Sequence, residues 1–466
     1  MENENIIDPS ELQAGLSEHF KLHSCLKKLN LRTIATKHRI TKQKGVEAFD
    51  VLLVLLNLTF LNRSIGHFIK FCRRQVYLIG SKDVFYRFSK RTDIRWREFL
   101  LDLGCLVINK LGSVSSWSKR VLILDDSIIP KKGKNFEGLS WVFDHTNHKS
   151  VRGFQALVLG WSDRASILPI DFALVGGKKK VQQATPFPEV DKRTVAFKRQ
   201  QELDMTKLEL AKQMLSRAKR RGIEAGAACF DTWFCWPKFV TSIVNEIGYN
   251  VVAMLKTTEK LTVTVKGKRY STKHVWSLVS KLKRTETMIR NEPVYVSSCV
   301  AKFGEVYVRL VFCKPKNAHS SNKPVILLSS DLELSPMQVI ETYAQRWAIE
   351  VFFKEAKQEL FLGKYQSISF QSGICFVTLS MTRFTILAYL ERMDNDYREK
   401  GSLFEQMRYE IEDLNMLAYL DKVIHLLMAI IPSKNKIITV LWEALSQIQD
   451  SIRVAIEVFV FQKCET

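Results

Sequence analysis

One stretch of the sequence decides the fold, and it reads Tyr343-Ala344-Gln345-Arg346-Trp347-Ala348-Ile349-Glu350-Val351-Phe352-Phe353-Lys354-Glu355-Ala356-Lys357. It contains neither Gly nor Pro, and Ser335 and Pro336 upstream suit an N-cap and a first helical position, so the sequence predicts one helix through the whole stretch. At about 100° per residue, four polar side chains would share an arc of roughly 60°: Tyr343, Arg346, Glu350 and Lys357. The carboxylate suits a metal ion and the other three groups suit phosphate oxygens, although an ordinary amphipathic helix with a solvated charged edge has the same pattern.

The charge of the chain favours a polyanion as its partner. The 466 residues include 70 Lys and Arg against 48 Asp and Glu, which gives a formal charge of +22. Such a surplus is typical of proteins that bind nucleic acid or an anionic membrane. Apolar runs such as Val51–Leu61 and Val423–Ile431 are too short to span a bilayer, and the acidic N-terminus is unlike a signal peptide. We therefore expect a soluble protein of the cytoplasm that binds DNA and no membrane.

The cysteines and histidines predict no structural metal site. The nine cysteines are odd in number and scattered, and no pair has C-x2-C spacing, so neither a zinc ribbon nor a disulfide framework is indicated. His145 and His148 have a spacing that could suit a metal, but no cysteine lies nearby and their setting is loop-like. We expect reduced thiols and no metal at these histidines.

Changes of pattern along the chain predict five segments. Residues 1–115 are helical in pattern with recurring basic side chains, which indicates a DNA-binding domain, although an ordinary helical domain would look similar. Short apolar runs alternating with helical segments predict an α/β catalytic core in two parts, 116–256 and 326–395. Residues 257–325 alternate in hydrophobicity and predict a β-rich insertion, and 396–466 predict a helical C-terminal domain that serves dimerisation.

Within the core, strands are expected at five apolar runs: 121–124, 154–161, 165–175, 227–230 and 249–255. One long helix is expected over Asp191–Arg221, because it ends in a cationic turn followed by a glycine. A second is expected over Trp236–Ile247, stopped by Gly248.

Three acids stand where an α/β fold places its ligands. Asp126 and Asp231 each close a short apolar run, and Glu350 lies on the helix that follows a third run. Three converging carboxylates would repel one another unless cations lay between them. Two Mg²⁺ ions about 3.5–4 Å apart meet that need and suit phosphoryl transfer, which requires no side-chain base. The lack of a convincing nucleophile–histidine pair fits this chemistry.

The spacing Y-x2-R-x3-E-x6-K around Glu350 resembles the signature of the DDE transposases of bacterial insertion sequences. The segment Leu124-Asp125-Asp126-Ser127 is similar to that family's first-acid motif, and Cys229-Phe230-Asp231 to its second. The resemblance covers roughly residues 120–363. It implies a ribonuclease-H-like core with a β-strand insertion between the second Asp and the Glu, which here are 350 − 231, or 119, residues apart.

The family resemblance implies cut-and-paste transposition. Such enzymes bind the terminal inverted repeats of their element as double-stranded DNA, dimerise into a paired-end complex, cleave each end and join the 3′-hydroxyls to target DNA. Carried over to this chain, the ligands of two Mg²⁺ ions, for which Mn²⁺ can substitute, are Asp126, Asp231 and Glu350. The residues that hold terminal phosphates are Tyr343, Arg346 and Lys357. The protein is then expected in the cytoplasm, associated with the nucleoid.

The sequence leaves the choice between Asp125 and Asp126 to the resemblance. Neighbouring side chains of a strand point to opposite faces, so only one of the two can readily face the metals. The family's first acid precedes a small hydroxyl residue, and Ser127 follows Asp126, which selects Asp126 with Asp125 as a neighbour that orients it.

Some relatives pass through a DNA hairpin and stack a flipped base on a tryptophan of the insertion. In this chain the insertion offers Trp276, and Trp233 and Trp347 are alternatives outside it. Two other functions stay open from the sequence. The protein could be a related nuclease that cuts without integrating, or a degenerate transposase that only binds DNA.

Overall fold

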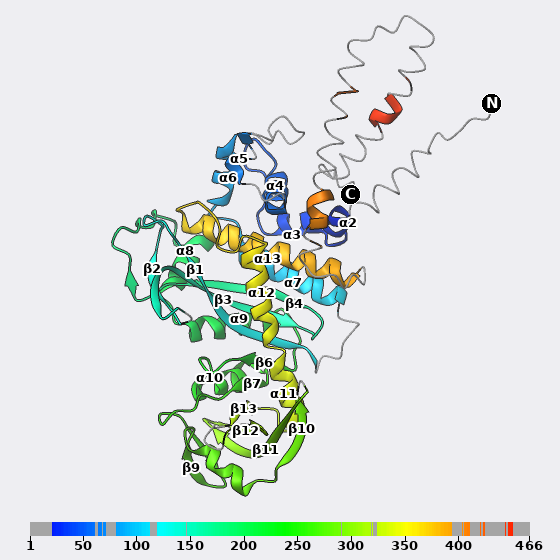
Figure 1. Cartoon of the computed structure of the whole chain (residues 1–466). Coiled ribbons are helices and arrows are strands. Elements are labelled where there is room, and N and C mark those ends of the chain that lie inside the picture. The colour runs from blue at the N-terminus through cyan, green and yellow to red at the C-terminus, as the bar shows by residue number, and fades with distance from the viewer. Residues whose placement is uncertain are drawn as a thin grey trace, which may run out of the picture. The chain divides into compact units, whose positions relative to one another are not determined.

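The computed structural model describes residues 21–60, 64–67, 69–70, 81–111, 119–145, 147–289, 291–317, 319, 324–393, 403, 405–410, 420, 423–424, 443 and 446–450. Within them the protein is mixed α/β, as predicted from the sequence (Figure 1). The chain divides into two compact units, Gly104–Lys354 and the combination of Met1–Leu103 with Glu355–Thr466. Most of the predicted C-terminal domain, 396–466, lies outside the described residues.

The unit Gly104–Lys354 is built on one mixed sheet, whose strands cross the centre of Figure 1. The strands of its first part are β1 (Val121–Pro130), β2 (Ser140–Asp144), β3 (Lys149–Ser162), β4 (Ile167–Val175), β5 (Lys179–Lys180), β6 (Ala227–Phe230) and β7 (Val251–Met254). Strand β1 pairs antiparallel with β3 and parallel with β6, which in turn pairs parallel with β7. The apolar runs in β1, β3, β4, β6 and β7 are buried on both faces of the sheet, which accounts for their lack of alternation.

The β-rich stretch after β7 extends the same sheet. Its strands are β8 (Thr262–Val265), β9 (Lys268–Ser271), β10 (Thr285–Ile289), β11 (Glu292–Phe303), β12 (Val306–Pro315) and β13 (Val325–Ser329), with a 3-10 helix η5 (Val275–Lys281). The sheet continues from β7 through β13, β12, β11 and β8 to β9. Strands β11 and β12 form a hairpin, and its turn contains Gly304 at φ 63°, a left-handed conformation that glycine adopts without strain.

The helix predicted over Asp191–Arg221 is in fact three elements. They are α8 (Val195–Gln201), the 3-10 helix η3 (Glu202–Asp204) and α9 (Lys207–Arg220). A capping box starts α9, because the Thr206 hydroxyl accepts a hydrogen bond from the Glu209 amide while the Glu209 carboxylate accepts one from the Thr206 amide. The next predicted helix consists of α10 (Pro237–Thr241) and the π-helix η4 (Ser242–Ile247), and Gly248 ends it as expected.

The single helix predicted through the stretch that contains Glu350 is also wrong. Ser335 caps α11 (Pro336–Ala344) with Pro336 in its first turn, as predicted, but α12 (Trp347–Gln358) begins after a turn at Gln345 and Arg346. In that turn the Arg346 amide donates to the Tyr343 carbonyl at 2.9 Å, and the Ile349 amide to the Arg346 carbonyl at 3.2 Å. These i→i−3 bonds tighten the backbone without Gly or Pro, and Arg346 still lies beside both Tyr343 and Glu350.

The other unit is helical. It contains α2 (Lys21–Lys28), α3 (Leu31–Lys37), α4 (Ala48–Phe60), α5 (Ile65–His67), α6 (Lys82–Ser89), the first part of α7 (Trp96–Leu111) and α13 (Phe370–Met393). Among the described residues, α13 alone has the length and composition to cross a membrane, which the shorter runs considered in the sequence did not reveal. Its most apolar window is 94% buried within the protein, as in a core helix. Buried Arg383 donates from Nε to the Leu56 carbonyl at 2.8 Å, and so satisfies a backbone group of α4.

A buried ion pair fixes α9 to the sheet. The Arg217 Nε donates to the Asp171 Oδ2 at 2.8 Å, and the Asp171 side chain is fully buried on β4. A carboxylate so far from water is costly to bury unless a cation lies against it. The pair therefore sets the position of α9 over β3 and β4.

We expect Arg217→Met to lower the free energy of unfolding by about 3–5 kcal/mol, because it leaves the Asp171 charge buried and uncompensated. Urea denaturation of the full chain measures the loss. Arg220→Met is the matched control, because Arg220 is an exposed arginine on the same helix and its loss should change little. Equal stability of the two variants would contradict the role given to the ion pair.

Candidate active site

Strand β1 contains two neighbouring acids whose side chains lie on opposite faces of the sheet. Asp125 and Asp126 are paired with Val158 and Leu157 of β3, so both lie within the hydrogen-bonded ladder rather than after it. The strand is longer than its apolar run because it pairs with β3 as far as Pro130. The Asp125 Oδ1 accepts a hydrogen bond from the Asp126 amide at 2.8 Å.

Asp125 faces the helices α11 and α12. The Arg346 Nη1 donates to the Asp125 Oδ2 at 2.8 Å, and the Arg346 Nη2 donates to the Glu350 Oε1. One guanidinium thus joins an acid of β1 to the acid of α12. Asp125 and Arg346 are largely buried, with side chains 18% and 16% exposed, so this bridge is poorly screened by solvent.

Asp231 lies beside Asp125. The parallel register of β1 and β6 sets Leu124 opposite Phe230, where β6 ends, and Asp231 follows directly after the strand. The charge of Asp231 contributes to the raised pKa of Asp125, and both Arg346 and Asp126 act on the pKa of Asp231, so Asp231 lies close to these groups. The Asp231 Oδ1 accepts a hydrogen bond from the Trp233 amide at 2.9 Å, which orients the carboxylate in the turn after β6. Asp125, Asp231 and Glu350 therefore converge around Arg346.

Asp126 faces the opposite side of the sheet. Its Oδ1 accepts from the Lys207 Nζ at 2.8 Å, and the same ammonium group lies 3.9 Å from the centre of the Trp233 ring. Sequence reasoning missed Lys207, the first residue of α9. The only local signal was the capping box that begins this helix, and it says nothing of a contact 81 residues away.

Burial shifts the proton affinity of these acids upward. Desolvation raises the pKa of Asp125 to about 7, against the lowering effects of the Asp126 amide and of Arg346, and the charges of Asp231 and Asp126 raise it further. Desolvation also raises the pKa of Asp231, to which the charge of Asp126 contributes. Burial thus disfavours the charged form of Asp125 and Asp231 even though Arg346 lies beside them.

The remaining predicted residues lie on α11 and α12. The Tyr343 hydroxyl is buried without a hydrogen-bond partner among the described residues, and burial raises the pKa of Tyr343 to about 12, so this group is a neutral donor. Arg346 lies 5.9 Å from the centre of the Tyr343 ring. Lys357 is half-buried near the end of α12 and belongs to the other compact unit.

The donor set suits hard divalent cations, although the acids are not arranged as a preformed metal site. No group of three or more His, Cys, Asp or Glu side chains of the described chain stands in position to hold a metal ion. Arg346 and Lys207 lie against the carboxylates instead. Carboxylate oxygens are the ligands that Mg²⁺ prefers, so the chemistry of Asp125, Asp231 and Glu350 fits such an ion.

Other features singled out from the sequence lie elsewhere in this unit. His145 packs edge-on against Phe143 at 4.9 Å, in the turn between β2 and β3. Trp276 lies on η5 with 38% of its surface exposed.

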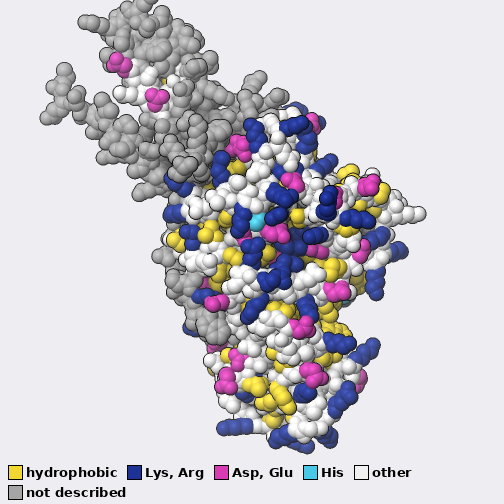
Figure 2. Space-filling model, turned by 180° about the vertical axis from the view of Figure 1, so that it is seen from behind, with side chains coloured by type: hydrophobic (Ala, Val, Ile, Leu, Met, Phe, Trp, Pro, Cys, Tyr) yellow, Lys and Arg dark blue, Asp and Glu magenta, His cyan; other side chains and the backbone are white. Residues whose placement is uncertain are grey.

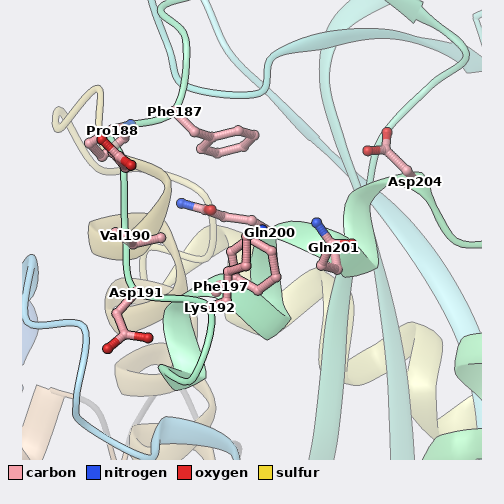
Figure 3. Close-up of a pocket in the computed structure, with 10 residues that line it drawn as sticks. Phe187, Pro188, Val190, Asp191, Lys192, Phe197, Gln200, Gln201 and Asp204 are labelled. Atoms are coloured by element: carbon pink, nitrogen blue, oxygen red, sulfur yellow. The ribbon is translucent and has the colours of Figure 1, made fainter.

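Figure 3 shows a surface cavity of about 760 Å³. It is lined by Phe187, Pro188, Glu189, Val190, Asp191, Lys192, Phe197, Gln200, Gln201 and Asp204, and so by none of the predicted site residues.

Two family models match the region that contains these acids. One, described as a DDE superfamily endonuclease, matches residues 80–273. The other, described as a transposase DDE domain, matches residues 204–381. Asp125 and Asp126 lie in the first match, Glu350 in the second and Asp231 in both. A search of the curated proteins returned no match.

The raised pKa of Asp125 predicts how stability depends on pH without metal. In the folded protein the Asp125 carboxyl binds a proton as the pH falls below about 7. In the unfolded chain the same carboxyl binds a proton only near its usual pKa of 3.8. Wild type should therefore gain stability relative to Asp125→Asn as the pH falls from about 8 to 5. Thermal unfolding in EDTA across this range measures the difference.

Asp191→Asn is the control, because the hydrogen bond from Arg193 lowers the pKa of that exposed acid and so moves its titration further below this range. Its difference from wild type should stay constant with pH. A constant difference for Asp125→Asn as well would contradict the assignment.

Proposed function

Because the chain belongs to the DDE transposases, we propose that it cuts the ends of an insertion sequence and joins them to new DNA in cut-and-paste transposition. The observation that carries this proposal is the convergence of Asp125, Asp231 and Glu350 around Arg346. A DDE domain implies a ribonuclease-H-like core. We take residues 257–325 as its β-rich insertion and the flanking helical regions as the DNA-binding and dimerisation parts.

The metal ligands are Asp231, Glu350 and an acid of β1. When bound between them, two Mg²⁺ ions, or Mn²⁺ in their place, would activate the attacking oxygen and stabilise the leaving oxygen of a phosphodiester. The resemblance selected Asp126 as the β1 acid. The position of Asp125, close to Asp231 and on the same guanidinium as Glu350, supports Asp125 instead. Asp126 then acts with Lys207 on the other face.

Three side chains hold the phosphates of the DNA end: Tyr343, Arg346 and Lys357. The Tyr343 hydroxyl is a buried donor that lacks a protein partner among the described residues, so a phosphate oxygen would satisfy it. The planar fork with which Arg346 binds two carboxylates is also the geometry that binds phosphate. The formal charge of +22 supports a DNA partner, and Figure 2 shows Lys and Arg side chains spread widely over one face, with acidic side chains scattered between them.

The working form is a homodimer on two DNA ends, in the cytoplasm with the nucleoid. A nuclease without integration and a degenerate transposase that only binds DNA are the competing functions. Both share the fold and the basic surface, so chemistry has to distinguish them.

A supercoiled donor plasmid with the element's own ends, incubated with the protein and Mg²⁺, separates the three functions. We expect excision followed by insertion into a target plasmid, and no cleavage by Glu350→Gln, whose binding to the ends should stay within about twofold because phosphate contacts dominate affinity. Excision without insertion would favour the nuclease. A shifted but uncut band would favour the binding protein, and cleavage by Glu350→Gln near the wild-type rate would exclude Glu350 from the chemistry.

A further inference from the structure

The strand β2 presents two large aromatic side chains to solvent. Burial alternates along it, with Ser140 and Val142 buried and Trp141 and Phe143 exposed by 38% and 45%. An alternating strand normally places polar residues on its solvent face. Adjacent exposed aromatics on one face have a cost in water, and such patches usually mark a binding surface.

Basic side chains flank these aromatics. Trp141 is paired with Arg152 of β3 on one side and with Lys179 of β5 on the other, so all three lie on one face of the sheet. Phe143 is paired with Ser150. We call these five residues, Trp141, Phe143, Ser150, Arg152 and Lys179, the β2 face. The only acid of β2, Asp144, alternates onto the opposite face.

The charges on the β2 face are not neutralised within the described part of the protein. The Arg152 Nη2 donates to the Lys132 carbonyl at 3.0 Å, which holds the guanidinium beside the strand without cancelling its charge. Neither Arg152 nor Lys179 pairs with a carboxylate of the described chain. Cations beside exposed aromatic rings suit a ligand that has both negative charge and flat π-faces.

The β2 face lies on the same side of the sheet as Asp125. The β1–β3 register pairs Asp125 with Val158 and has no shift between there and Gly153, so Arg152, six residues from Val158, shares the side of Val158. Six residues of strand span about 20 Å. That is roughly six base steps at 3.4 Å each along a DNA strand.

From this placement we propose that the β2 face binds unpaired bases of a DNA strand, with Trp141 as the stacking platform and Arg152 and Lys179 on the flanking phosphates. A base exposes its π-face only when it is unpaired and unstacked, whereas a duplex offers this surface mainly phosphates. This proposal adds a second DNA-binding surface to the proposed function. It rests on that function, because the DNA strand is taken to extend from the carboxylates to the β2 face.

The test compares single-stranded with double-stranded DNA. Fluorescence anisotropy of the full-length protein would measure Kd for an oligothymidylate of about 20 nucleotides and for a duplex of equal length. We expect Trp141→Ala to raise Kd for the single strand about tenfold and to change Kd for the duplex less than about twofold. Tyr307→Ala is the control, since Tyr307 of β12 is an aromatic residue that is even more exposed, at 62%, and it should change neither. Trp141→Phe should restore most of the binding.

Lys179→Ala supplies an independent readout if Trp141→Ala does not fold. It should reduce the salt dependence of single-strand binding by about 0.7 in the slope of log Kd against log salt concentration. An unchanged slope, equal effects of Trp141→Ala and Tyr307→Ala, or an equal loss on single strand and duplex would each overturn the proposal.

The outcome is separable from that of the proposed function. Nicking in Mg²⁺ is measured on the same preparations as binding. Binding that depends on Trp141 in a protein that never cuts would contradict the transposase alone, whereas active transposition with unaltered single-strand binding by Trp141→Ala would contradict the β2 face alone.

Discussion

The bridge that Arg346 makes between Asp125 and Glu350 is the interaction on which the site depends. It joins acids that lie 350 − 125, or 225, positions apart, Asp125 on strand β1 and Glu350 on α12. Because these acids and Asp231 lie close together, they would repel one another without a cation between them. The tight turn between α11 and α12 is what brings Arg346 to that point, one helical turn before Glu350.

The opposite directions of Asp125 and Asp126 divide the site between the two faces of the sheet. Asp125 faces Arg346 and the α12 acid, and Asp126 faces Lys207 of α9. The buried Arg217–Asp171 pair holds α9 in place, and so it also holds Lys207 near Asp126. The buried pair Arg217–Asp171 and the contact Lys207–Asp126 therefore both depend on the position of α9.

The sequence predicted those parts of the fold that depend on local pattern. The run 227–230 is a strand with the predicted bounds, because a buried strand is a continuous apolar run in the sequence. Gly248 ends the helix before it, because glycine is the residue that adopts left-handed backbone without strain. The capping box at Thr206 was visible in the sequence and was overlooked. The break at Arg346 has no Gly or Pro to mark it, and the Lys207–Asp126 contact and the continuation of the sheet through β13 come from long-range pairing that one sequence cannot supply.

The most direct test of the proposed site is whether Asp125 or Asp126 is the β1 acid that binds the metal. The salt bridges of Arg346 to Asp125 and Glu350 predict Asp125. The decisive measurement is Mg²⁺-dependent nicking of an end-containing duplex by Asp125→Asn and Asp126→Asn side by side. With Asp125 as the ligand, Asp125→Asn should lose nicking entirely and Asp126→Asn should retain a measurable rate. Full activity in Asp125→Asn with none in Asp126→Asn would contradict the account.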